Sequence, residues 1–473
     1  MDLTFIAIFG VIALISGWFT KTRNWLVLLA SLLAVYAVQP ATPIRGLDYW
    51  LPTLTLALTI LVWAATRQTG QPFQRTDFYS LGIALSLALL VGLNRYLEPV
   101  CCLTPTRPPI LPQVIIGLVI LSLLVWFVVR WGTGKQWTLL GSILVLLFFF
   151  IILKSPSLAQ SASAFLRSLT GQRPDLSSAL DIRWLGFSYV AFRLIHTLRD
   201  RMAGRLASVS LQEMLIYSVF FPAFTAGPID RLPRFTPELR QPFQLSWDSL
   251  WNGAQRIGLG IFKKFILADS LALIALNDLN ASQVVHTGWL WLLVYVYALR
   301  LYFDFSGYTD IAIGLGLWMG FKLPENFDQP YLKPNLTQFW NSWHITLAQW
   351  FRAYFFNPLT RWLRSRSHPL PMWAMILIAQ TGTMLLIGLW HGLTWNFLIW
   401  GLWHAAGLFI HNRWNELVQP HLVNLTASPR AASLLAGTGT LLTFHYVTLG
   451  WVWFALSSPD LSWNTLLRLA GLR

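Results

Sequence analysis

The stretch "LLIGLWHGLTWNFLIWGLWHAAGLFIH" (385–411) decides the fold, because it joins two apolar runs through a short interruption. The first run ends near His391, and Gly392 and Thr394 precede the second. Together with flanking residues, each run approaches the roughly 20 residues that a helix needs to cross a bilayer. The pattern predicts two apolar helices with a break near Gly392. It also places an imidazole in an apolar setting, where it is either a packed core residue or a chemical group shielded from water.

Composition extends this interpretation to all 473 residues, of which 55% are hydrophobic and only 11% are charged. Soluble domains carry about 25% charged residues. Apolar runs recur at 3–19, 24–40, 49–66, 78–94, 112–130, 137–153, 184–198, 211–226, 256–276, 288–303, 305–320, 372–389, 393–410 and 435–456. Because several runs contain Gly, Pro or charge, we expect about 11 to 14 membrane helices, some of them short or re-entrant. The predicted fold class is all-α, a polytopic transmembrane helical bundle.

The charge pattern favours a membrane surface over nucleic acid as the partner. The net charge of +15 comes from clusters in short loops, such as Arg199 to Arg205 and Arg361 to Arg366. Such clusters are typical of cytoplasmic loops and attract anionic lipids. The start of the chain lacks a basic segment and a cleavage site, so we interpret it as a retained first helix. The adjacent Cys101 and Cys102 are predicted to be plain loop residues, and no metal site is expected.

Polar residues divide the chain into three parts. Residues 1–180 predict generic N-terminal transmembrane helices, and residues 411–473 predict a C-terminal loop and transmembrane helix. Ionisable and amide side chains enter the apolar runs between these parts, so function is expected in residues 181–410. The polar stretches 155–182 and 227–250 are predicted to be extramembrane loops, with short surface helices.

Two pairs of charged residues interrupt apolar runs. Asp304 and Asp310 flank "FSGYT", which predicts either a helix break lining a polar cavity or a loop whose aspartates cap the next helix. Because unpaired burial is costly, we expect both carboxylates to pair with Arg, Lys or backbone donors. Lys263 and Lys264 are interpreted as side chains that extend to the membrane interface.

Three further histidines occupy apolar surroundings. His344 lies in "NLTQFWNSWHITLAQWFRAYFF" (335–356), which predicts an amphipathic or re-entrant helix packed against the bundle. His404 and His411 are seven residues apart and so share one helix face. From the pattern alone, a structural role is favoured over chemistry for His344. Nothing in the pattern enforces the facing pair that haem ligation by His404 and His411 would need.

Four stretches together resemble the membrane-bound O-acyltransferase (MBOAT) family. They are "FFPAFTAGPIDRLPRF" (220–235), "GLGIFKKFILAD" (258–269), the segment 302–359 that contains "YFDFSGYTDIAIGLGLWMGF" and "NSWHITLAQW", and "GLWHGLTWNFLIWGLWHAAGL" (388–408). The order and spacing are most similar to the bacterial branch that contains the alginate O-acetylation protein and the D-alanyl transferase of teichoic acid synthesis. The segment around 184–205 departs from that branch, with Arg193 and His196 inside it, and could reflect a different acceptor.

The resemblance implies a helical bundle around a central tunnel, with His391 and His344 as catalytic residues. It marks residues 181–410 as the catalytic core. Candidate substrate-binding or tunnel-lining residues are Asp304, Ser306, Tyr308, Asp310, Asn341, Trp343, Trp390, Asn396 and His404. It also implies a multi-pass protein of the bacterial inner membrane that binds no cofactor. The donor would be acetyl-CoA or an acyl-carrier-protein thioester, and the partners a glycan acceptor or a periplasmic acyltransferase, besides membrane lipids.

The expected reaction moves an acyl group, acetyl being favoured, from a cytoplasmic thioester to a hydroxyl of an extracytoplasmic polysaccharide or its carrier. Imidazole has an ordinary pKa near 6.5 and suits general-base duty, so His391 would take the hydroxyl proton. The alternative is a proton-coupled transporter that uses intramembrane His and Asp residues. Transporters commonly contain inverted repeats, and we find no such symmetry in the sequence. A scaffold for polysaccharide export would leave His391 unexplained.

Overall fold

The computed structural model describes residues 2–97, 103–418, 420 and 428–472, and Cys101 and Cys102 lie outside these ranges. Within them the regular structure is helical, apart from one isolated antiparallel bridge between Phe327 and Trp343. The all-α prediction is confirmed. The chain forms two compact units: an N-terminal unit, Met1–Ile257 with Ile311–Pro324, and a C-terminal unit, Gly258–Asp310 with Glu325–Arg473.

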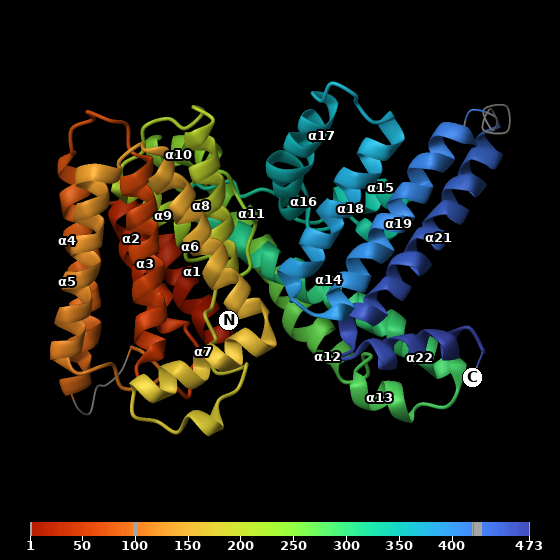
Figure 1. Ribbon diagram of the computed structural model, residues 1–473, viewed down its shortest axis with the longest axis horizontal. Helices are drawn as coiled ribbons and strands as arrows, with labels where there is room; N and C mark the ends of the chain where they lie inside the picture. The colour runs from red at the N-terminus through yellow and green to blue at the C-terminus, as the bar shows by residue number, and fades with distance from the viewer. Residues whose placement is uncertain (1, 98–102, 419, 421–427, 473) are drawn as a thin grey trace. The chain divides into compact units, whose positions relative to one another are not determined.

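The N-terminal unit is built around one buried helix, α3, which contacts α2, α4, α5, α6, α8 and α9. Its helices are α1 (Leu3–Trp18), α2 (Arg23–Ala37), α3 (Leu47–Thr66), α4 (Arg75–Leu93), η1 (Asn94–Tyr96), α5 (Leu111–Phe127), η2 (Val128–Gly132), α6 (Gln136–Lys154), α7 (Pro156–Leu169), η3 (Pro174–Leu176), α8 (Phe187–Met202), α9 (Leu211–Ser218) and α10 (Leu232–Arg240). Helix α4 runs beside α5, which also contacts α3 but is otherwise largely exposed (Figure 1).

The C-terminal unit centres on a helical hairpin, α18–α19, against which the shorter segments pack (Figure 1). Its elements are η4 (Phe262–Ala268), α12 (Asp269–Ala272), α13 (Asp278–Gln283), η5 (Pro330–Leu332), α15 (Leu336–Ser342), α16 (Ile345–Phe351), η6 (Arg352–Phe356), α17 (Asn357–Arg364), α18 (Met372–His391), α19 (Trp395–Leu417), α21 (Pro429–Ala455) and α22 (Pro459–Leu469). Two helices have residues in both units, α11 (Trp247–Ile261) and α14 (Thr287–Trp318).

Five of the described helices are long and apolar enough to cross a membrane by length and composition. They are Leu47–Thr66, Arg75–Tyr96, Leu111–Gly132, Gln136–Lys154 and Met372–His391, and two shorter apolar helices are Leu3–Trp18 and Arg23–Ala37. Each of these seven helices coincides with a predicted apolar run. The surface helices α7 and α10 lie in the two polar stretches that were predicted to be extramembrane loops.

Two predicted spans, 288–303 and 305–320, are wrong, because α14 runs without a break from Thr287 to Trp318. Asp304 and Asp310 therefore lie inside a helix, and neither the predicted break nor the predicted cap exists. The glycine between them serves close packing instead. A Cβ on Gly307 would lie 2.8 Å from the Gly260 carbonyl oxygen and 2.8 Å from the Lys264 nitrogen.

The predicted span 211–226 is also wrong, because α9 ends at Ser218 and the chain continues as turns. Buried Arg193 of α8 explains how these turns are stabilised. Its guanidinium donates to the carbonyl oxygens of Ser218, Ala223 and Pro228, at 3.1, 2.8 and 3.3 Å. Buried carbonyl groups need such partners wherever a helix does not supply them.

The hairpin of α18 and α19 depends on glycines at its closest approach. The interruption at Gly392, Leu393 and Thr394 is where the sequence predicts a break, and that prediction is confirmed. A Cβ on Gly388 would lie 2.3 Å from the Phe397 carbonyl oxygen, and one on Gly401 would lie 2.8 Å from the Met384 carbonyl oxygen. Only a residue without a side chain lets the two backbones approach this closely, and this approach positions His391 at the end of α18.

We predict that Gly388→Ala destabilises the protein, because its Cβ meets the backbone of α19 rather than a movable side chain. Gly437→Ala is the matched control. It is another helical glycine, whose Cβ would have no neighbour within 4 Å, and alanine favours helix by about 1 kcal/mol. Thermal unfolding of the detergent-solubilised protein should show a lower midpoint for Gly388→Ala and an unchanged or higher one for Gly437→Ala. Equal midpoints for both variants would contradict the close-approach argument.

Candidate active site

His391 is the last residue of α18 and lies among aromatic rings from three helices. Its ring centroid is 4.5 Å from that of Trp390, 5.8 Å from Phe397, 5.7 Å from Trp400 and 4.7 Å from Phe454. The side chain is half-buried rather than enclosed. An imidazole held by rings on several sides keeps a fixed orientation while one part of it stays accessible.

His344 interrupts the predicted helix 335–356, which is in fact two short helices, α15 and α16, followed by the π-helical turn η6. The residue has φ 43° and ψ 53°, the left-handed conformation that side chains other than glycine rarely adopt. Such a conformation costs of order 1–3 kcal/mol and persists only when the surroundings enforce it. The sequence expectation of one helix is therefore wrong at the histidine itself.

Buried Asn326 and its neighbours enforce this conformation. The Ile345 amide donates to the Asn326 carbonyl at 3.0 Å, and the Asp328 amide donates to the Ser342 carbonyl at 3.0 Å. The Asn326 side-chain oxygen accepts from the Thr346 hydroxyl at 2.6 Å and from the Thr346 amide at 3.3 Å. These bonds hold the chain on both sides of His344, so the polar loop before α15 determines where the imidazole points.

One tryptophan brings the two histidines together. The Trp390 ring lies 4.5 Å from the His391 ring and 6.0 Å from the His344 ring, measured between centroids. Phe305 of α14 lies on His344 as well, at 4.7 Å. Both imidazoles thus contact the same indole, although one comes from the end of α18 and the other from the junction of α15 and α16.

His344 and His404 are buried, whereas His391 is half-buried. His344 is 4% exposed, and neither of its ring nitrogens has a hydrogen-bond partner within the described part of the chain. His404 is fully buried, and its ring nitrogens likewise have no partner among the described residues. Trp340 and Trp400 enclose His404 at 5.1 and 4.8 Å, whereas His411 bonds to Thr337 at 3.0 Å. His404 and His411 contact the same helix, α15, as their spacing predicts.

The two aspartates of α14 form ion pairs with adjacent lysines of the π-helical turn η4. Lys263 Nζ donates to Asp310 Oδ2 at 2.7 Å, and Lys264 Nζ donates to Asp304 Oδ1 at 2.5 Å. The predicted pairing is confirmed, but only Asp310 is buried. The Asp304 side chain is 51% exposed. We expected the lysines to extend to the membrane interface, and instead each ammonium group is used in an ion pair.

Other candidate residues serve packing or line a separate cavity. Asn396 donates to the Leu456 carbonyl at 2.7 Å and to the Ser462 hydroxyl at 3.1 Å, which ties α19 to the turn before α22. Trp343 packs on Phe327 and Trp451. Ser306 and Tyr308 are buried inside α14.

A cavity of about 200 Å³ lies next to the aromatic cluster. Trp340, which packs on Trp400 and His404, forms part of its wall. Its polar lining includes Asn341, which accepts a 2.6 Å hydrogen bond from Arg352, and Gln380, which accepts one of 3.0 Å from Asn412. The cavity therefore combines apolar walls with amide groups and one guanidinium.

Sequence reasoning missed Asn326, Arg352 and Phe454 as residues of this site. Asn326 had a signal, since it is a polar residue inside the resembling segment 302–359, but its burial became visible only in the structure. Arg352 lies eleven residues from Asn341 across a helix break, so no helical spacing links them. Phe454 approaches from α21, far along the chain, and no local pattern indicates that contact.

Comparison with known proteins shows that His344 and His391 lie in a region that matches a protein family. The model of the MBOAT, membrane-bound O-acyltransferase family matches residues 126–446, which include both. A probable alginate O-acetylase of Azotobacter vinelandii is 34% identical over 281 residues, covering 59% of this chain and 52% of the relative. The teichoic acid D-alanyltransferase of Bacillus subtilis is 32% identical over 282 residues, covering 58% and 69%. The peptidoglycan O-acetyltransferase of Helicobacter pylori is 32% identical over 270 residues, covering 56% and 48%.

The extent of these matches sets a limit on what they transfer. The match spans about half the length of the alginate O-acetylase and of the peptidoglycan O-acetyltransferase. Residues before 126 lie outside the family match, so α1 to α4 and most of α5 have no counterpart in it.

We predict that the two ion pairs differ in their effect on stability. Asp310→Ala leaves the half-buried Lys263 without its carboxylate, and breaking a largely buried pair in this way costs up to about 3–5 kcal/mol. Asp304→Ala, the matched change six residues earlier on α14, should cost much less because that carboxylate is half-exposed. Thermal unfolding in detergent measures both. If the two variants lower the unfolding midpoint equally, the burial of Asp310 does not make its ion pair the more stabilising one.

Proposed function

Because this chain belongs to the membrane-bound O-acyltransferase family, we propose that it is an integral-membrane O-acyltransferase of the bacterial inner membrane. It would move an acyl group, acetyl being favoured, from a cytoplasmic thioester to a hydroxyl of an extracytoplasmic polysaccharide or its carrier. The names of the relatives describe O-acetylation of alginate and peptidoglycan and D-alanylation of teichoic acid. The common element of these names is acyl transfer to a cell-envelope polymer.

The observation that carries the proposal is the shared contact of His344 and His391 with Trp390. Reacting groups gain rate when they are held in one place and orientation. Two imidazoles from distant parts of the sequence meet there, and one of them is fixed in a left-handed backbone conformation. Strained residues of this kind cluster at active sites.

In the proposed mechanism, His391 acts as general base. As the acceptor hydroxyl oxygen attacks the thioester carbonyl carbon, an imidazole nitrogen of His391 takes the hydroxyl proton. The carbon–sulfur bond then breaks, the imidazolium returns the proton to the departing thiolate, and the products are an ester and a free thiol. We favour this direct attack over a covalent intermediate, because the rings described around His391, those of Trp390, Phe397, Trp400 and Phe454, carry no nucleophile. The half-burial of His391 lets an acceptor reach it, and the surrounding rings exclude water that would hydrolyse the thioester.

His344 would orient the substrates. Its ring nitrogens are buried and have no partner in the described ranges, so they can bond to a substrate without first losing a protein contact. A neutral imidazole N–H could polarise the thioester carbonyl or hold the acceptor hydroxyl. Burying an unpartnered polar group costs free energy, and a bound substrate would recover it.

The cavity beside Trp340 supports a donor with a pantetheine arm. Pantetheine carries two amides, and the cavity lining offers amides at Asn341 and Gln380 and a guanidinium at Arg352 within apolar walls. Acetyl-CoA and an acyl carrier protein both present their thioester on this arm, so the cavity suits either donor. The acceptor partner would be a glycan or a periplasmic acyltransferase that receives the group.

The transporter alternative is less well supported. A proton relay needs carboxylates that can exchange protons with the histidines. Here Asp304 and Asp310 each form an ion pair with a lysine of η4.

Replacing His391 by Ala should abolish O-acyl transfer without loss of folded protein. Removal of a general base typically costs about 10²–10⁴-fold in rate. His411→Ala is the matched control, because His411 lies on α19 of the same helical hairpin and bonds to Thr337 of α15. Its transfer should fall only in proportion to protein abundance. The assay is O-acyl content of envelope glycan per amount of folded membrane protein. Normal transfer by His391→Ala at normal abundance would overturn the mechanism.

Glycine substitutions at the residues with a left-handed backbone conformation distinguish the role of the His344 backbone from the role of its imidazole. His344→Gly and His344→Ala both remove the ring, but only glycine adopts φ 43° without strain. We expect at least as much folded protein from His344→Gly as from His344→Ala, and strongly reduced transfer from both. Gln329→Gly, at the other non-glycine residue with positive φ (44°) among those that the structure describes, should leave transfer intact. Transfer at the wild-type level by His344→Gly would assign His344 a structural role only.

A further inference from the structure

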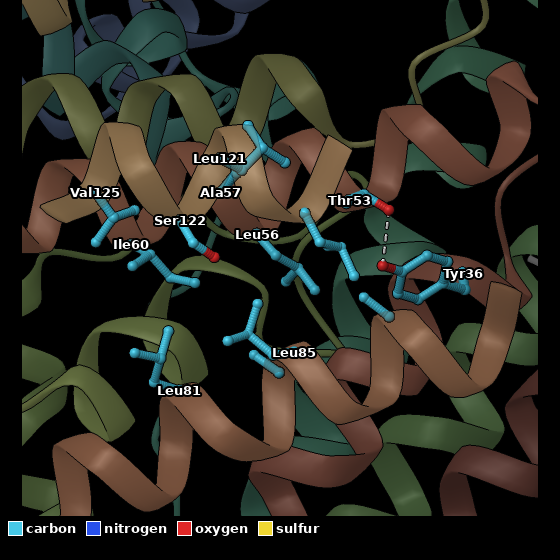
Figure 2. A pocket seen from close by; sticks show the side chains of 13 residues that line it. Tyr36, Thr53, Leu56, Ala57, Ile60, Leu81, Leu85, Leu121, Ser122 and Val125 are labelled. Carbon is cyan, nitrogen blue, oxygen red and sulfur yellow. Dashed lines mark hydrogen bonds between the residues drawn. The ribbon is translucent and has the colours of Figure 1, made fainter. Parts of the chain in front are cut away.

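A second cavity lies in the N-terminal unit, among α2, α3, α4 and α5 (Figure 2). Its inner volume is about 80 Å³, and its empty space is about 530 Å³ when the open side is included. All its lining side chains are apolar except for the hydroxyl-bearing Tyr36, Thr53 and Ser122. Every lining residue precedes residue 126, so the cavity lies outside the part of the chain that matches the family.

The cavity is elongated along the helix axes. Three helices line it over comparable lengths, from Thr53 to Ile60 on α3, from Leu81 to Ala88 on α4 and from Leu118 to Val125 on α5. At 1.5 Å per residue, each of these segments is roughly 10 Å long. Tyr36 and Thr53 lie at one end of the cavity, and Ile60 and Val125 lie at the other (Figure 2).

The cavity is closed on one side and open on the other. Leu56, Ala57 and Ile60 of α3 form a buried floor, and 83% of the α3 span is buried. On α5, the lining residue Leu121 is half-buried and the lining residue Ser122 is exposed. Only 6% of the α5 span is buried. The opening therefore lies along α4 and α5, whose apolar outer faces suit lipid. Hydrocarbon rather than water surrounds an opening of this kind in a bilayer.

The hydroxyl groups that line the cavity do not require a polar ligand. Tyr36 Oη lies 2.9 Å from Thr53 Oγ1, and Thr53 donates to the Tyr49 carbonyl at 2.8 Å (Figure 2). These two side chains satisfy each other at the closed end. Ser122 lines the cavity from α5, at an exposed position. A water molecule inside would find few partners, and apolar cavities accept apolar ligands in preference to water.

We propose that this cavity binds one hydrocarbon chain of a membrane lipid. The chain enters from the bilayer on the side lined by α4 and α5 and lies parallel to the helices, which is also the direction of lipid chains in a bilayer. The length, the apolar lining and the lateral opening together fit a single alkyl chain and exclude a headgroup from the floor. This site goes beyond the proposed acyl transfer and does not depend on it.

Photo-crosslinking of the full chain tests the site. The protein is reconstituted in phosphatidylcholine vesicles that contain a fraction of phosphatidylcholine with a diazirine in one acyl chain. After irradiation, adducts are mapped by peptide mass spectrometry. We expect adducts on the buried floor residues Leu56 and Ile60. Adducts on Ile120 and Leu123, exposed on the outer face of α5, serve as the internal control for contact with ordinary bilayer lipid.

Two variants fill the cavity from opposite sides. Ala57→Phe occupies the floor, and Ser122→Phe closes the opening from an exposed position that tolerates a larger side chain. Each should lose the Leu56 and Ile60 adducts and keep those on Ile120 and Leu123. If Ala57→Phe does not fold, Ser122→Phe alone decides. Wild-type protein with adducts on the outer face only would overturn the proposal, and so would floor adducts that persist in a folded cavity-filling variant.

Discussion

The cost of leaving a polar group unpaired in apolar surroundings determines where the polar side chains of this protein lie. Arg193 satisfies three carbonyls of a non-helical turn, Asn326 bonds to Thr346, and Lys263 pairs with Asp310. Each of these groups would destabilise the fold if it lacked its partner. His344 and His404 depart from this rule, because their buried ring nitrogens have no partner within the described residues. In the proposed mechanism, the ring nitrogens of His344 bond to a substrate.

The sequence predicts the parts of the fold that depend on local pattern. Length and hydropathy locate α1 to α6 and α18, and Gly392 marks the break between α18 and α19. The same reasoning fails where tertiary contacts decide. It divides α14 because "FSGYT" is typical of a break, although Gly307 there serves a close backbone approach. It also extends α9 through residues 219–226, because no local signal shows that Arg193 satisfies the carbonyls.

In the candidate site, too, the sequence predicts some features, whereas tertiary contacts decide others. Family resemblance selects His344 and His391, and the structure places both against Trp390. The left-handed conformation of His344 could not be predicted, because it depends on pairing between residues 326–328 and 342–345. Contacts such as Phe454 on His391 join segments separated by a whole helix. The cavity lined by α2 to α5 lies before the family match, whereas both histidines lie within it.

The central claim is direct acyl transfer with His391 as base, and one measurement tests it most directly. Purified protein is mixed with a radiolabelled acetyl thioester, with and without a hydroxyl acceptor, and thiol release, ester formation and label on the protein are followed in a single turnover. The account predicts one thiol released per ester formed, only when acceptor is present, no label on the protein, and neither product from His391→Gln. Thiol release without acceptor that leaves the acyl group on the protein would contradict direct transfer. Ester formation by His391→Gln at the wild-type rate would contradict the role of His391.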